Sequence, residues 1–179
     1  MMGRAILAID PGPVKSGLVE MYIGNGGVPS LKFCGVVENP QVLSFLRAGM
    51  GGLGWHAVVI EYPQCMGMVA SQALLDTAGW AGRFEASFAL GPSRHGYGDT
   101  HRVKRTDVKL HLCGTCRAKD SNVRQALIDR WGPRGTKKEP GPTYGIAGDA
   151  WAALAVATYW LDTHTAQSGA DIYIEELEG

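Results

Sequence analysis

The sequence predicts an α/β protein built on a mixed sheet, with an antiparallel hairpin beside parallel strands and helices packed against them. Two short runs of exclusively apolar residues, 5–9 and 57–60, are typical of strands that are covered on both faces. The segment between these runs contains four consecutive turn residues, 24–27, as expected of a hairpin. Residues 69–87 carry apolar side chains near helical spacing, and a strongly apolar segment follows Asp149, which together predict covering helices.

The first three strands form the hairpin side of the sheet. Residues 5–9 are the first strand, because their apolar run ends abruptly at Asp10 and a Pro-Gly turn. Residues 16–23 alternate in polarity and form the second strand. The glycines of the following turn supply positive φ angles, so that residues 31–37 return as the third strand.

Two further strands are expected after the hairpin, giving a five-stranded sheet. Residues 57–60 are fully apolar and end at Glu61, which is followed by a Tyr-Pro pair. The opening pattern of apolar run, acid and turn therefore occurs twice. Residues 102–105 form a short strand at the edge of the sheet.

Helix signals separate and follow these strands. Asn39 is a favourable N-cap, Pro40 suits the first helical position, and Gly49 marks the end of this short helix. A longer helix is expected over residues 69–87, where apolar side chains form a stripe near helical spacing. Both helices are expected to cover the sheet.

Two short helices are expected in the second half. Thr106 is the expected N-cap of one helix, which Gly114 ends. Asp120 or Ser121 is the expected N-cap of the next, which Gly132 ends.

The C-terminal part begins with a loop and ends with a long apolar helix. Residues 132–148 are rich in Gly, Pro and Lys, which predicts an exposed and mobile loop. Asp149 opens a strongly apolar helix. Residues 171–179 are expected to form a tail or a docking strand. We therefore expect one domain over residues 1–165 and an acidic C-terminal tail over residues 166–179.

Length and composition predict a soluble, cytoplasmic protein. The 179 residues suffice for one core and contain no apolar stretch near the ~18 residues that span a bilayer. Asp10 and Lys15 interrupt the N-terminal apolar run, so no export signal is expected. Four cysteines in a chain of this length do not form a disulfide framework, and reduced thiols are expected.

The net charge of zero conceals a polarised distribution. Residues 91–140 contain twelve Lys and Arg against five Asp and Glu, a net charge of +7 that the rest of the chain balances. Such a segment favours a polyanionic partner such as nucleic acid, although solvated helix faces also carry charge runs. Candidate phosphate contacts are Arg102, Lys104, Arg105, Arg117, Lys137 and Lys138.

Three acids are candidates for a metal site. If the first and fourth strands pair in parallel, Asp10 and Glu61 lie at neighbouring carboxyl ends, about one strand spacing of ~4.8 Å apart. Two such carboxylates repel each other unless a cation lies between them, and oxygen ligands without a His or Cys cluster suit Mg²⁺ or Mn²⁺. Asp149 is a possible third ligand, although capping alone also explains an Asp at a helix start.

Four segments in this order resemble the RuvC group of Holliday-junction resolvases in the RNase H-like superfamily, especially versions carried by bacteriophages. The segments are AIDPGPVKSG, VVIEYP, TDVKLHLCGTCRAKDSNVRQALIDRWG and GDAWAALAVA. The resemblance implies an RNase H-like fold and makes Asp10, Glu61 and Asp149 metal-binding catalytic carboxylates. It also implies catalytic roles for Lys109 and Lys119, which solvated surface lysines would explain equally.

By this resemblance, the protein is a metal-dependent endonuclease that resolves four-way and other branched DNA in a bacterial or phage-infected host cell. Two Mg²⁺ ions, for which Mn²⁺ can substitute, are expected to share Asp10, and hydrolysis is expected to leave 5′-phosphate ends. The two-fold symmetry of a junction fits a homodimer. No nucleotide cofactor is implied.

The sequence departs from the family pattern at two places. The family usually has an acid or histidine one helical turn before its last aspartate, where this chain has Ile146. A fourth metal ligand must therefore come from elsewhere. The family's wedge aromatic also has no clear counterpart, and Met66 or Met68 are the apolar candidates for inserting between bases.

Three other functions remain open at this point. A related nuclease acting on flaps or RNA–DNA hybrids would use the same three acids. A non-cleaving junction-binding module would need only the basic surface. The Asp-Pro-Gly segment also faintly resembles the first phosphate loop of actin-like ATPases, which need two such domains.

Overall fold

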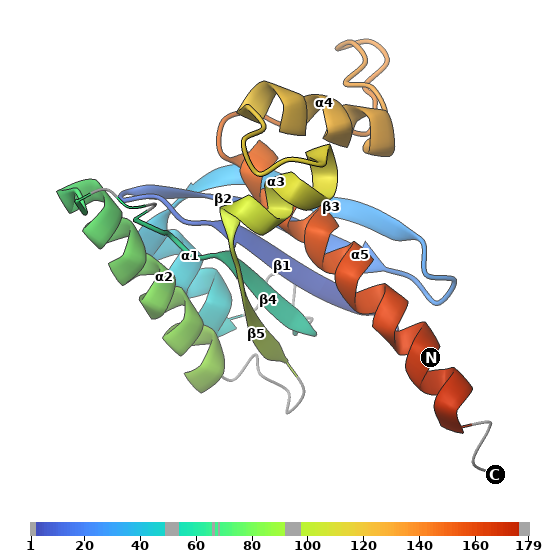
Figure 1. Cartoon of the computed structure of the whole chain (residues 1–179), viewed down its shortest axis with the longest axis horizontal. Helices are drawn as coiled ribbons and strands as arrows, with labels where there is room; N and C mark the ends of the chain where they lie inside the picture. Colours follow the sequence, from blue (N-terminus) through green and yellow to red (C-terminus); the bar gives the residue numbers. More distant parts are fainter. Residues whose placement is uncertain (1–2, 49–53, 66, 68, 92–97, 176–179) are drawn as a thin grey trace.

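A computed structural model describes residues 3–48, 54–65, 67, 69–91 and 98–175, with residues 165–175 described by their backbone. Its centre is a five-stranded sheet in the order β3-β2-β1-β4-β5, with helices on both faces (Figure 1). The strands are β1 (Arg4–Asp10), β2 (Lys15–Ile23), β3 (Pro29–Glu38), β4 (Ala57–Glu61) and β5 (Asp99–Val103). The helices are α1 (Asn39–Ala48), α2 (Gln72–Leu90), α3 (Arg105–Cys113), α4 (Asp120–Trp131) and α5 (Ala150–Glu175).

The pairing of the strands confirms the predicted mixed sheet. Strands β1, β2 and β3 form an antiparallel meander, whereas β1, β4 and β5 run parallel to one another. In the parallel pair Ile9 lies opposite Ile60, so that β1 and β4 end at the same level. The α/β fold class and the expected position of the hairpin are therefore confirmed.

The side chains of the central strands alternate between two cores. Ile6 and Ala8 of β1 face α3, α4 and α5, whereas Leu7 and Ile9 face α1 and α2. All four are completely buried. Because successive side chains point to opposite faces, Asp10 continues the row of Ile6 and Ala8 and lies on the α5 face.

The helix boundaries differ from the predictions where side chains bind elsewhere. Helix α1 begins at Asn39, whose side chain bonds the Gly12 carbonyl and the Ser16 hydroxyl. The residues at the N-cap positions of α3 and α4 are Lys104 and Lys119, and neither side chain caps its helix.

The predicted caps of α3 and α4 are therefore wrong. Thr106 lies inside α3, and Asp120 lies in the first turn of α4, where two basic side chains bind its carboxylate. The Ser121 hydroxyl contacts the Asn122 side chain. Helix α2 differs from α3 and α4 because it has a side-chain cap: the Ser71 hydroxyl accepts a hydrogen bond from the Leu74 amide.

The C-terminal part agrees with one prediction and corrects another. Most of residues 132–148 are exposed and lie outside helices and strands, as expected of a loop. Within it, residues 133–141 form a closed turn above α4, held by a bridge between Gly135 and Pro140 and by the bond from the Gly141 amide to the Arg134 carbonyl (Figure 1). Helix α5 continues to Glu175, so most of the stretch expected to be a tail or strand is helical.

Within the described part of the chain, no helix has the length and apolarity needed to cross a membrane. The four cysteines, Cys34, Cys65, Cys113 and Cys116, are free, as expected. Met66 and Met68, the candidate wedge residues, lie outside the described residues.

Candidate active site

Asp10 and Glu61 are neighbours at the carboxyl ends of β1 and β4. The register of the two strands pairs Ile9 with Ile60 and places the two acids side by side. Both are half-buried, and only 11% of the Glu61 side chain is exposed. This edge of a parallel sheet is where open α/β folds bind ligands.

Asp149 reaches the same place from the start of α5. Asp10 pairs with Gly17 across β1 and β2, and the Asp149 backbone packs directly on that glycine. A Cβ atom at position 17 would lie 2.2 Å from the Asp149 carbonyl oxygen. The missing side chain of Gly17 therefore permits the approach that brings Asp149 beside Asp10.

A cavity of about 300 Å³ joins the three acids. Asp10, Glu61 and Asp149 all line it, together with Asp120 and residues of α3, α4 and α5. A second cavity of about 310 Å³ shares Asp10 and Glu61 and extends toward Pro63 and α2. The structure thus brings together the three acids that the sequence singled out.

The turn after Asp10 is fixed by a buried polar network. The Ser16 hydroxyl donates to the Asn39 side-chain oxygen at 2.7 Å and accepts a bond from the Gly12 amide at 3.4 Å. The Asn39 amide donates to the Gly12 carbonyl at 2.9 Å. Ser16 and Asn39 are completely buried, so these bonds satisfy groups that burial would otherwise leave unpaired.

Basic side chains of α3 enter the acidic site. Arg105 donates one bond to Glu61 and another to Asp120, each at 3.0 Å. Lys109, one helical turn later, contacts Asp120 at 3.1 Å. Arg105, expected to bind DNA phosphates, is therefore an internal partner of the acids in this structure.

Burial raises the pKa of both central acids, and neighbouring carboxylates add to the rise. Burial is the main cause that raises the pKa of Asp10 to about 8, and the charge of Glu61 adds to it. Arg105 opposes this rise, while Asp149 and Asp120 reinforce it. Burial also raises the pKa of Glu61, against the attraction of Arg105. The protonated forms of both acids are therefore favoured when no cation lies between them.

The donor atoms of this site match Mg²⁺ or Mn²⁺ in kind, because all are carboxylate oxygens. Their positions match only in part. Among the described residues, no three Asp, Glu, His or Cys side chains lie close enough together to bind one ion. Asp10 and Glu61 form a pair, and Asp149 is exposed at the rim of the cavity, with Arg105 bound to Glu61. The acids are assembled, and their side chains are not closed around a metal.

The position of Ile146 agrees with its apolar character. Its side chain is 2% exposed and belongs to the core between the sheet and α5, so it offers no ligand. Asp120 is the fourth acid that lines the cavity. The sequence suggests only a capping role for Asp120. In the structure Arg105 and Lys109, four residues apart on one face of α3, both bind its carboxylate.

The other candidate residues lie away from the three acids. Arg102 binds Glu85 and covers the ring of Tyr62, so it is also an internal partner. Lys119 lines neither cavity. The remaining exposed cations from the list of candidates are Lys104, Arg117, Lys137 and Lys138.

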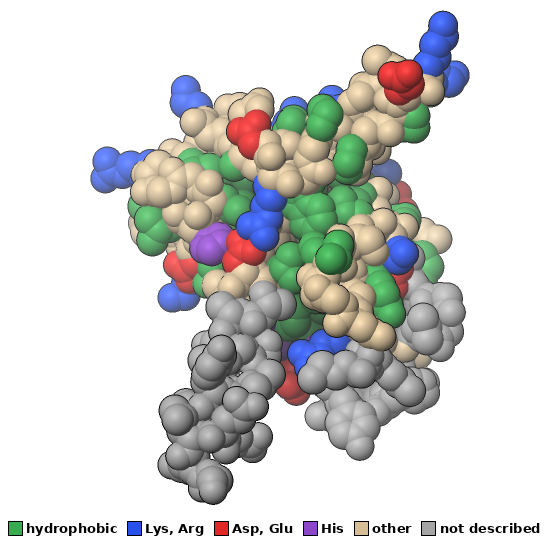
Figure 2. Space-filling view, turned by 90° about the vertical axis from the view of Figure 1, so that its right-hand side faces the viewer, with side chains coloured by type: hydrophobic (Ala, Val, Ile, Leu, Met, Phe, Trp, Pro, Cys, Tyr) green, Lys and Arg blue, Asp and Glu red, His purple; other side chains and the backbone are tan. Residues whose placement is uncertain are grey.

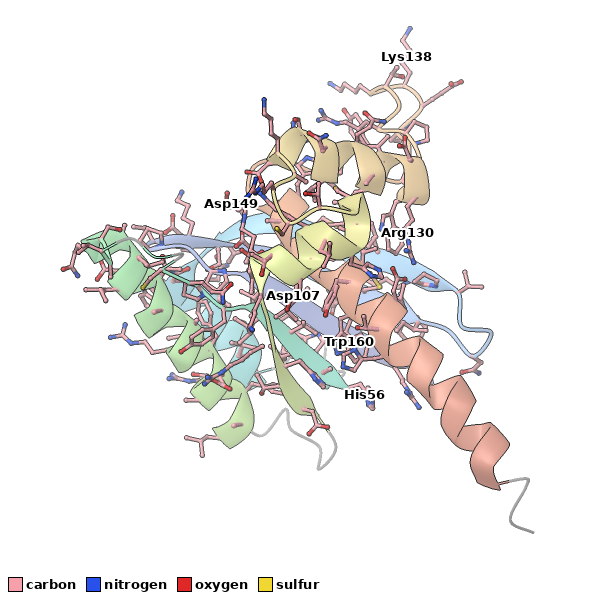
Figure 3. The ribbon with its side chains drawn as sticks, in the orientation of Figure 1. His56, Asp107, Arg130, Lys138, Asp149 and Trp160 are labelled. Carbon is pink, nitrogen blue, oxygen red and sulfur yellow. The ribbon has the colours of Figure 1, made fainter. Side chains whose placement is uncertain are left out.

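The figures show how these cations are placed. Lys138 lies at the tip of the closed turn, far from Asp149 (Figure 3). In Figure 2, Lys and Arg side chains stand out from the top of the molecule. His56 and Trp160 lie toward the other end of the sheet from Asp149.

Replacing Arg105 with Ala is expected to destabilise the protein at pH 7. Glu61 would then be a nearly buried carboxylate without its partner. Because 43% of Arg105 is exposed, we expect a loss of about 2 kcal/mol, less than the 3–5 kcal/mol typical of a fully buried pair. Urea unfolding measures the change.

Arg102→Ala is the matched control for this experiment. It also breaks an arginine–glutamate pair next to the sheet, but on an exposed surface, so its effect should be much smaller. Equal losses in the two variants would contradict the structural role that we assign to Arg105.

Solved structures resemble this fold. Thermus thermophilus RuvC has a TM-score of 0.59 and 18% identity, covering 89% of this chain and 96% of that chain. T. thermophilus RuvC in complex with a Holliday junction substrate gives 0.63 and 16%, covering 94% and 97%. The yeast mitochondrial Holliday junction resolvase gives 0.65 and 9%, covering 97% and 86%.

No protein-family model and no curated protein matches the sequence. The similarity to the solved structures spans nearly the whole chain in each case. It agrees with the strand order and with the placement of α5 over the sheet. The chain therefore has the RNase H-like fold in the form found in RuvC.

Proposed function

We propose that this protein is a metal-dependent endonuclease that cleaves four-way DNA junctions. The observation that carries the proposal is the buried pair of Asp10 and Glu61 at adjacent parallel strand ends, with Asp149 lining the same cavity. The fold is shared with a protein named as a mitochondrial Holliday junction resolvase and with RuvC, which was solved in complex with a Holliday junction substrate. Together, the fold and the acids at its sheet edge support nuclease chemistry on branched DNA.

Asp10, Glu61 and Asp149 would hold Mg²⁺, or Mn²⁺ in its place. The chemistry supplied there would be activation of the attacking water and stabilisation of the departing 3′ oxygen, so that hydrolysis would leave 5′-phosphate ends. Asp149 is exposed, so its side chain is free to turn toward the buried pair. Arg105 would release Glu61 and keep its second bond to Asp120.

The exposed cations would bind the DNA backbone. Lys104 and Lys119 immediately precede α3 and α4, and the residue after each of them, Arg105 and Asp120, lines the cavity. Lys137 and Lys138 lie on the closed turn and would reach a more distant part of the DNA. Such contacts provide affinity that falls steeply with salt and no sequence readout.

A homodimer would place two such sites on one junction. A four-way junction has two-fold symmetry, and a dimer with the same symmetry would cut two opposing strands. Paired, symmetric nicks are therefore expected from the full-length protein.

Cleavage of end-labelled substrates in Mg²⁺ tests the proposal. A four-way junction, a flap, an RNA–DNA hybrid and a linear duplex should be compared at equal concentration. We expect symmetric cuts in the junction with 5′-phosphate ends, and little cleavage of the duplex. Preference for the hybrid or flap would favour another nuclease, whereas binding without cleavage would favour a junction-binding module.

A further inference from the structure

Three basic residues line the cavity that contains the acids, and two of them are already neutralised. Arg105 binds Glu61 and Asp120, and Lys109 binds Asp120. The third is Arg124 of α4. Among the described residues, Arg124 forms no ion pair, so its positive charge is available to a ligand in the cavity.

Arg124 is an exposed residue whose guanidinium contacts an aromatic ring and, in the described structure, no acidic partner. It lies over the ring of Trp151, with its central carbon 5.5 Å from the ring centroid. Trp151 is 5% exposed and is the second residue of α5, two positions after Asp149. A guanidinium over a ring face does not use its N–H groups in this contact, so they stay available to a ligand. The start of α5 therefore positions both Asp149 and this cation.

A phosphodiester that enters the cavity brings negative charge close to four acids, Asp10, Glu61, Asp120 and Asp149. Metal bound to the acids would offset part of this repulsion, and a cation without an acidic partner would offset more of it. Arg105 forms ion pairs with Glu61 and Asp120, and Lys109 forms an ion pair with Asp120. Lys119, one of the two lysines for which the family resemblance implies a catalytic role, lines neither cavity.

We propose that Arg124 binds the phosphodiester that is cleaved, through a guanidinium oriented on Trp151 and directed at its two non-bridging oxygens. This inference rests on the proposed function and identifies the residue that positions its substrate. The fork of a guanidinium matches two phosphate oxygens, which a lysine at this position would not. Arg124 then compensates the negative charge of the diester on which the acids act.

Arg124→Gln tests the assignment, with Arg83→Gln as its control. Arg83 also lies over a tryptophan, Trp80, at 4.7 Å, but on α2 and outside both acid-lined cavities. Under saturating four-way junction in Mg²⁺, we expect Arg124→Gln to cleave about 10²-fold more slowly than the wild type. Arg83→Gln should remain within about twofold, and Arg124→Lys should recover part of the loss.

A second measurement separates phosphate binding from a merely structural role. A junction with one uncharged methylphosphonate at the mapped cleavage position is compared with the normal junction, without divalent ions. The wild type should bind the modified junction more weakly, whereas Arg124→Gln should bind both equally. Melting temperatures of the two Gln variants check that each is folded.

The outcomes distinguish the two proposals. A wild-type protein that cleaves no branched DNA overturns the proposed function, and the role of Arg124 with it. Cleavage by the wild type together with equal rates for Arg124→Gln and Arg83→Gln overturns the role of Arg124 alone. The same conclusion follows if Arg124→Gln discriminates between the two junctions as strongly as the wild type.

Discussion

An Asp10→Asn variant is expected to lose cleavage and to unfold at a higher temperature than the wild type at pH 8 in the absence of metal. Burial and the neighbouring Glu61 raise the pKa of Asp10 to about 8, so the ionised carboxylate is unfavourable in the folded protein. Asparagine has nearly the same shape and no charge. In a domain of this size, 1 kcal/mol shifts the melting temperature by about 2–4 °C.

The pH dependence of this difference follows from the direction of the pKa shift. The pKa of Asp10 is about 8 in the folded protein and near its ordinary value of 3.8 in the unfolded chain. The stability of the wild type at this residue is therefore full below pH 4 and is lost as the pH rises to 8. The variant lacks this loss, so the two melting curves should converge at low pH and separate toward pH 8.

The same variant measures the proposed role in metal binding. Loss of a metal ligand should reduce junction cleavage by about 10³-fold or more, since each 1.4 kcal/mol is a factor of ten. Mn²⁺ should raise the melting temperature of the wild type, because a ligand that binds only the folded state stabilises it, and should raise that of the variant less.

Asp76→Asn is the control for this substitution. It makes the same isosteric change on the exposed surface of α2, outside the cavity that holds the acids. Its cleavage rate and its response to Mn²⁺ should match the wild type. Wild-type cleavage by Asp10→Asn would show that Asp10 is not part of the active site.

The sequence was sufficient to place the two acids that end strands. Apolar runs of the right length predict β1 and β4, and the parallel pairing on which the site depends is a condition that the structure confirms. Once those strands pair in parallel, the register leaves Asp10 and Glu61 side by side. This part of the site depends only on backbone geometry, which local sequence patterns indicate well.

The basic partners of these acids could not be predicted from local sequence patterns. Arg105 lies 44 residues after Glu61, and its bond depends on the direction of its side chain from α3. The net charge of +7 on residues 91–140 predicts a surface for polyanions. Several cations of this segment instead have acidic partners within the protein, namely Arg102, Arg105, Lys109 and Arg130. Net charge shows that cations are present and not where each side chain points.

Gly17 was also missed, because its importance arises from a segment 132 residues later in the chain. In the sequence it is an ordinary small residue of a strand. In the structure it lies opposite Asp10 and beneath the backbone of Asp149. The Asp-Pro-Gly turn and this glycine together set the distance between the first and last acids.

Gly17→Ala is therefore expected to displace Asp149 and to lower both stability and cleavage. The new Cβ atom would meet the Asp149 carbonyl carbon at 2.4 Å and the Ala150 nitrogen at 2.9 Å, and backbone atoms cannot rotate away. Overpacking of this kind costs about 1–3 kcal/mol. A shift of about 1 Å in a catalytic group can cost about 10²-fold in rate. Urea unfolding and junction cleavage measure the two effects.

Gly26→Ala separates this close approach from the general cost of replacing a glycine. Gly26 lies in the turn between β2 and β3, and a Cβ atom there would have no neighbour within 4 Å. Its stability and cleavage rate should remain near those of the wild type. If Gly17→Ala is destabilised but cleaves normally where it is fully folded, the contact between β2 and α5 serves the fold alone. A loss of cleavage in the folded variant, with a weaker response to Mn²⁺, would show that this contact positions Asp149 for the metal site.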